Sequence, residues 1–155
     1  MPANSTSESD ILKLTGQILV LEPEGKWTTV IRKNPFTPLV PCERLLSVAE
    51  LLEKAWKLPT IALISSNQEQ LVELTGRLSP LLTRKTFACW LIGERLNDEL
   101  TAWIERAGFC GVLTSLIEHS RWHNRAQRFF DAAPPVDWTL EQRIEHQYPW
   151  RSSLK

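Results

Sequence analysis

The sequence is poor in the residues and patterns that mark several classes of protein. It has one methionine, one tyrosine and three cysteines, Cys42, Cys89 and Cys110, among 155 residues. An odd number of cysteines without a Cys-x-x-Cys pair indicates reduced thiols and a cytoplasmic location rather than a disulfide framework. No run approaches the roughly 18 apolar residues of a membrane span. The first ten residues also lack the basic and apolar regions of a signal peptide.

The sequence has no excess of either charge, because 18 basic residues balance 18 acidic ones. This balance argues against nucleic acid or a membrane surface as the partner. Gly25 is the single glycine just after the first apolar run, so a glycine-rich phosphate loop is absent there. We therefore expect no cofactor. The 43% of hydrophobic residues and the length instead fit one globular domain.

Short apolar segments alternate with amphipathic ones, which predicts an α/β fold with a parallel sheet and helices on both of its faces. Residues 25–34 fit either a short helix or a hairpin with the first strand, and we favour the helix. The domain is expected over residues 15–131. A disordered tail is expected over 1–14, and a Pro- and Trp-containing tail with room for a short helix over 132–155. The predicted strands are 17–21, 36–42, 60–64, 86–92 and 111–114.

Helix starts and ends carry recognisable signals. Ser47-x-x-Glu50 and Ser66-x-x-Glu69 have the pattern of capping boxes. Asn97 is a predicted N-cap, and Gly108 is placed for a left-handed C-terminal residue. Pro80 is expected to kink its helix or to split off the last turn. Three tryptophans fall on apolar stripes or in strands and are expected in the core: Trp56, Trp90 and Trp103.

Two segments resemble the receiver domain of two-component response regulators. Ile18-Leu-Val-Leu-Glu22 is similar to the first receiver strand with its acidic end. The segment from Glu105 to Ser115, ERAGFCGVLTS, is similar to the passage into the last receiver strand and helix. The resemblance implies a flavodoxin-like three-layer α/β/α sandwich, with a five-stranded parallel sheet in the order 2-1-3-4-5.

The resemblance also implies a pocket at the strand ends, and this pocket lacks most receiver chemistry. Receivers use acids after the first strand, an acceptor aspartate after the third and a lysine after the fifth. The corresponding positions here hold Glu22, Ser65 with Ser66, and Thr114 with Ser115. Glu94 follows the fourth strand. We therefore expect no catalytic residue and no bound metal.

These observations favour a non-catalytic pseudo-receiver that serves as a signalling or regulatory scaffold for protein–protein recognition. The alternative is a small enzyme, or a ligand- or metal-binding protein, with its site at Glu22, Ser66 and Glu94. A deep pocket with converging polar groups would favour a ligand, whereas a shallow and filled edge would favour an interaction module.

The last predicted helix, residues 117–131, is the candidate interface. Arg121 and Arg125 share one face, while His119, Trp122 and His123 lie toward the other, where part of them is expected to border exposed surface. The two histidines have a metal-ligand spacing but lack a third ligand. We expect a protein partner or a homodimer to cover this surface. Two tryptophans of the tail, Trp138 and Trp150, would add anchors.

Overall fold

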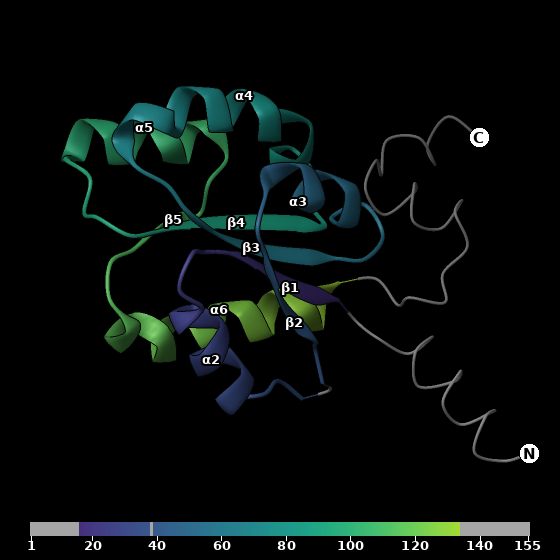
Figure 1. Cartoon of the computed structure of the whole chain (residues 1–155). Helices are drawn as coiled ribbons and strands as arrows, with labels where there is room; N and C mark the ends of the chain where they lie inside the picture. The colour runs from purple at the N-terminus through teal and green to yellow at the C-terminus, as the bar shows by residue number, and fades with distance from the viewer. Residues whose placement is uncertain (1–15, 38, 134–155) are drawn as a thin grey trace, which may run out of the picture.

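The five strands of the protein form a single parallel sheet (Figure 1). The structure, a computed structural model, describes residues 16–37 and 39–133. The strands lie in the order β2-β1-β3-β4-β5, with every neighbouring pair parallel. This order confirms the predicted flavodoxin-like arrangement. The strands are β1 (Gln17–Leu21), β2 (Cys42–Leu45), β3 (Thr60–Ser65), β4 (Phe87–Ile92) and β5 (Gly111–Leu113).

Helices cover both faces of the sheet, as the right-handed crossovers between parallel strands require (Figure 1). Two helices lie on one face, α2 (Lys26–Lys33) and α6 (His119–Ala132). Three lie on the other, α3 (Val48–Lys54), α4 (Leu71–Leu82) and α5 (Asp98–Ala107). Short 3₁₀ turns, η1 (Gln68–Gln70) and η2 (Leu116–Glu118), precede α4 and α6. None of the helices in the described residues has the length and apolar character needed to cross a membrane.

Each face of the sheet has its own core. The face under α3, α4 and α5 is mainly aliphatic, with Leu78, Leu81 and Ile104 fully buried. We call it the leucine core. The face under α2 and α6 is rich in rings and is here called the aromatic core. Its ring-bearing apolar members are Trp27, Phe36, Trp90, Trp122 and Phe130.

The favoured interpretation of residues 25–34 is confirmed, because α2 occupies this segment. The second strand, however, lies at Cys42–Leu45 and not at 36–42. Pro38 and Pro41 explain the difference, since proline has no N–H to donate to a sheet and the ladder begins only after the last of them. Phe36 and Val40 are instead buried in the aromatic core.

The predicted helix signals are correct at three of the capping positions. Ser47 Oγ accepts from Glu50 N at 3.2 Å, Asn97 Oδ1 accepts from Leu100 N at 2.8 Å, and Gly108 has φ 115°. Pro80 does not split its helix, because α4 runs on to Leu82. Gly76, whose carbonyl loses its helical partner there, is exposed and open to water.

The prediction that Ser66 is an N-cap is wrong. Asn67 Oδ1 accepts from Gln70 N at 3.1 Å and caps the turn, while Ser66 Oγ donates to the carbonyl of Asn67. The helix is entered through the 3₁₀ turn η1, which moves the cap one residue along the chain.

Of the three tryptophans expected in the core, only Trp90 is buried there, with 5% of its surface exposed. Trp103 is partly buried against the leucine core. Trp56 is 49% exposed, and the Arg84 guanidinium lies 4.2 Å from its ring centroid. The expectation for Trp56 is therefore wrong. A cation–π contact on the surface replaces burial at this position.

The two ends of the described domain meet at the amino edge of the sheet (Figure 1). A Cβ at Gly16 would come within 2.5 Å of Phe130 Cε1 and 2.7 Å of the Pro59 carbonyl oxygen. The start of β1 therefore passes directly beneath the last turns of α6. The predictions for residues 1–14 and for the tail beyond 133, with Trp138 and Trp150, fall outside the described residues.

Candidate functional site

The carboxyl ends of four strands surround one hollow of about 500 Å³, here called the carboxyl-edge hollow. The strand ends of a parallel sheet meet at this edge, which is where open α/β sheets bind their ligands. Four of the five predicted pocket residues line it: Glu22, Ser65, Glu94 and Ser115. Its other lining residues are Pro23, Glu24, Lys26, Trp27, Ile92, Gly93, Thr114 and Leu116.

Glu22 is the most buried acid of the hollow, at 7% exposure, and both of its carboxylate oxygens are occupied. Oε2 accepts from Trp27 N at 3.1 Å, and Oε1 accepts from Thr28 N at 3.2 Å and from Thr28 Oγ1 at 3.4 Å. The carboxylate thus caps the amino end of α2, where Gly25 offers no side chain. Sequence reasoning missed this role, although a helix that begins after glycine needs an acceptor from elsewhere.

The end of β5 is closed in a similar way by Glu118. Glu118 Oε1 accepts from Thr114 N at 2.9 Å, from Thr114 Oγ1 at 2.8 Å and from Ser115 N at 3.1 Å. Ser115 Oγ accepts from Ile117 N, which completes a capping box. The hydrogen bonds from Thr114 lower the pKa of Glu118 below its usual range. The pattern Ser115-x-x-Glu118 was visible in the sequence but was not singled out.

Few polar groups of the carboxyl-edge hollow are left free. Glu24 and Lys26 pair at 2.9 Å, and this hydrogen bond lowers the pKa of Glu24 and raises that of Lys26. Glu94 is exposed and makes no hydrogen bond or ion pair with the described residues. Across residues 16–37 and 39–133 no three His, Cys, Asp or Glu side chains are grouped so as to hold a metal ion.

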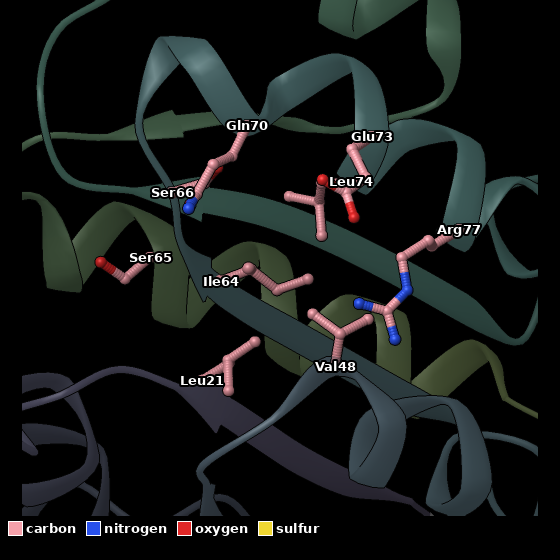
Figure 2. Close-up of a pocket in the computed structure, with 9 residues that line it drawn as sticks. All are labelled: Leu21, Val48, Ile64, Ser65, Ser66, Gln70, Glu73, Leu74 and Arg77. Atoms are coloured by element: carbon pink, nitrogen blue, oxygen red, sulfur yellow. The ribbon is translucent and has the colours of Figure 1, made fainter.

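Ser66 lines a different hollow, of about 210 Å³, between the ends of β1 and β3 and helices α3 and α4 (Figure 2). We call it the α3–α4 hollow. Figure 2 shows the Glu73 carboxylate and the Arg77 guanidinium directed toward its apolar side chains. Ser66 therefore lines this hollow and not the one that Glu22 and Glu94 line, while Ser65 lines both. The apolar side chains are Leu21, Val48, Ile64 and Leu74.

Two residues of the predicted interface, Trp122 and His119, belong to the aromatic core. They are 1% and 8% exposed, so the expectation that they border exposed surface is wrong. The rings of Trp27, Phe36 and Trp90 surround Trp122 edge-on, with centroids 6.1 to 6.4 Å away. Burial lowers the pKa of His119, and the neighbouring His123 lowers it further. The sequence could not show that α2 and the segment after it close over this part of α6.

The remaining interface residues lie at the surface. His123 is partly exposed, stacks on Phe36 with centroids 4.2 Å apart, and has Nε2 3.2 Å from the Asn34 carbonyl oxygen. Arg121 and Arg125 are exposed and line a hollow of about 180 Å³ beside β5, the edge strand. The His119 and His123 centroids are 5.6 Å apart, but no third ligand is grouped with them in the described residues.

Comparison with known proteins finds a similarity in fold only. No protein-family model matches it, and no curated protein matches its sequence. Among solved structures it is similar to the crystal structure of a Burkholderia pseudomallei protein described as pilus assembly-related. The two share 17% of their residues with a TM-score of 0.55, over 79% of this chain and 95% of the other. Similarity at this level shows that the two proteins share the α/β fold.

Proposed function

We propose that this protein is a non-catalytic pseudo-receiver that acts as a protein–protein interaction module without aspartate phosphorylation. The proposal rests on the residues at the ends of the strands. At the strand ends where a receiver needs its acids, its acceptor aspartate and its lysine, the hollow presents Glu22, Ser65 and Thr114 with Ser115. Three of these residues already form hydrogen bonds that cap other elements. Glu22 accepts from backbone amides at the start of α2, and the amides of Thr114 and Ser115 donate to Glu118.

The chemistry of phosphoryl transfer explains why this set is insufficient. A serine hydroxyl is not ionised at neutral pH, and within the described residues Ser65 makes no hydrogen bond to a base that could activate it. Magnesium needs oxygen ligands that are free to bind it, and Glu94 is the one carboxylate of the described hollow without a partner. Directly after β5, where a receiver has the lysine that neutralises a phosphoryl group, this chain has Thr114 and Ser115.

Exposed apolar residues support a role in recognition. Leu116 is 37% exposed and Ile117 is 90% exposed, and both lie on the turn η2 that borders the carboxyl-edge hollow. Neighbouring exposed apolar side chains of this kind are typical of protein interaction sites. The three cysteines are free thiols, as in a cytoplasmic protein. Burial raises the pKa of Cys42 to about 12, so this thiol stays protonated and is a poor nucleophile, which agrees with a non-catalytic role.

A ligand-binding function is the second candidate, because a volume of about 500 Å³ is in the range of small-molecule pockets. The polar groups at the hollow argue against it, as most of them bond to their own neighbours rather than converge on a free space.

The test is incubation of the full chain with Mg²⁺ and acetyl phosphate, followed by intact-mass measurement. We expect no change in mass, while an intact response-regulator receiver treated in parallel gains one phosphoryl group. A stable phosphoryl increment on this chain would refute the proposal. The immobilised chain should then retain a protein from its native cell, with and without Mg²⁺ and acetyl phosphate. Retention of a small molecule without any protein would favour the ligand-binding function.

A further inference from the structure

The geometry of the carboxyl-edge hollow points to a particular kind of partner. We infer that the hollow and the adjoining η2 turn bind a protein segment that presents an apolar side chain followed closely by a lysine or arginine. The inference rests on the proposed function and specifies the surface and the partner that it uses.

The accessible apolar side chains of this surface are Leu116, which lines the hollow and is 37% exposed, and its chain neighbour Ile117. Trp27 and Ile92 also line the hollow but are only 7% and 4% exposed. Ile117 is 90% exposed, more than any other large apolar residue of the described chain. It cannot turn inward cheaply, because Ser115 and Glu118 fix the turn that carries it. An apolar side chain of a partner would remove Leu116 and Ile117 from water.

The charged half of the surface is acidic. Three glutamates, Glu22, Glu24 and Glu94, line the hollow against one lysine, Lys26. Lys26 is paired with Glu24, and Glu22 accepts hydrogen bonds from backbone amides at the start of α2. Glu94 is therefore the one charged group lining the hollow that has no partner in the part of the chain that the structure describes. A lysine or arginine of the bound segment supplies the complementary charge. A bare metal ion would not, since no group of ligands surrounds Glu94 in the described residues.

The surface is also held in place before a partner arrives. The Glu22 cap fixes the start of α2 on one side of the hollow, and the Glu118 cap fixes η2 on the other. Binding to such a surface costs little ordering of the protein itself. The α3–α4 hollow is smaller and carries both signs of charge, through Glu73 and Arg77, and therefore selects no single sign of partner.

The experiment titrates the ¹⁵N-labelled full chain with a capped hexapeptide containing Leu-Ser-Lys and follows its amide and indole signals. We expect shifts confined to Trp27, residues 93–95 and residues 114–118. A peptide with Glu in place of Lys, or Ser in place of Leu, should bind about ten-fold more weakly, and added salt should weaken the Lys peptide. No shift up to about 1 mM peptide, shifts elsewhere, or equal binding of the three peptides would overturn the inference.

Matched variants separate the surface from general effects of substitution. Glu94→Lys and Ile117→Ser should each weaken the Leu-Ser-Lys peptide by about five- to ten-fold. Two control variants lie at exposed positions that do not line the hollow: Glu105→Lys on α5 repeats the charge reversal, and Val72→Ser on α4 likewise replaces a β-branched apolar side chain by serine. Both should bind as the wild type does.

Failure of the inference can be told apart from failure of the proposed function. A phosphoryl increment with acetyl phosphate would refute the function itself. An unphosphorylated chain whose captured protein partner binds Glu94→Lys and Ile117→Ser as tightly as wild type would leave the function standing and overturn the inference. Loss of that partner in these two variants, with its retention by Glu105→Lys and Val72→Ser, is the result we expect.

Discussion

The two faces of the sheet are stabilised in different ways. The leucine core packs aliphatic side chains, and its helices α3 and α5 are capped by their own flanking residues, Ser47 and Asn97. The aromatic core packs rings edge-on and contains two buried nitrogens, His119 Nε2 and Trp122 Nε1, that have no hydrogen-bond partner within residues 16–37 and 39–133. The cap of its helix α2 comes from Glu22 at the end of β1. The aromatic face is therefore the one whose stability is tied directly to the carboxyl-edge hollow.

The largest expected effect compares one residue from each core. Trp122→Ala should cost about 3–5 kcal/mol of unfolding free energy, through lost burial, a cavity and lost ring contacts. Leu78→Ala should cost about 2–5 kcal/mol, and we expect its cost to be smaller than that of Trp122→Ala. Urea unfolding measures both. Trp122→Phe is a control that keeps a ring and removes the unpartnered N–H. A larger cost for Leu78→Ala would show that the ring contacts add nothing to the aromatic core.

The next effect concerns the cap that links the aromatic face to the hollow. Glu22→Ala should lower the unfolding free energy by about 1–2 kcal/mol, because the amide groups of Trp27 and Thr28 lose their acceptor. Glu22→Gln should lower it less, since the amide oxygen still accepts. Glu24→Gln breaks only an exposed pair and should leave stability unchanged. Equal stability of all three variants in urea unfolding would mean that Glu22 is not a cap.

A pH effect is expected from the aromatic face. The pKa of His119 lies below its ordinary value of 6.5, so the unfolded chain binds more protons than the folded one as the pH falls below 6.5. This contribution to stability is present at pH 7.5 and is lost on acidification to pH 5.5. Urea unfolding at the two pH values should show the loss in the wild type and less of it in His119→Leu. The same loss in both proteins would assign the pH dependence to another group.

The smallest effect tests the corrected cap of the leucine face. Asn67→Ala should cost about 1 kcal/mol, because Asn67 caps the turn that opens α4. Ser66→Ala should change stability by less than about 0.5 kcal/mol, since its hydroxyl only donates to the next carbonyl. Thermal unfolding of the two variants compares them directly. A reversed order would restore Ser66 as the cap.

The fold could be predicted from the sequence because its signals are local. Alternating apolar segments, Asn97 and Gly108 each act within a few residues, and the structure bears them out. Burial could not be predicted as well. Trp56 and Trp122 were both expected on apolar helical stripes, but Trp56 lies in the turn after α3, whereas Trp122 lies within α6 with Trp27 of α2 and Phe36 packed against it. Of the five residues expected together at the strand ends, four line one hollow and Ser66 lines another. To predict that Glu22 caps α2, one would have to know that β1 leads directly into a helix whose N-cap residue, Gly25, has no side chain to cap it.

The tight passage of Gly16 beneath Phe130 has a practical consequence. It places both ends of the described domain at the amino edge of the sheet, whereas the carboxyl-edge hollow lies at the opposite edge. A fluorescent protein, an affinity handle or a linkage to a sensor chip that is joined next to residue 16 or residue 133 therefore starts at the edge opposite the hollow. Measurements with the attachment moved from one end to the other should give the same affinity for a partner bound there.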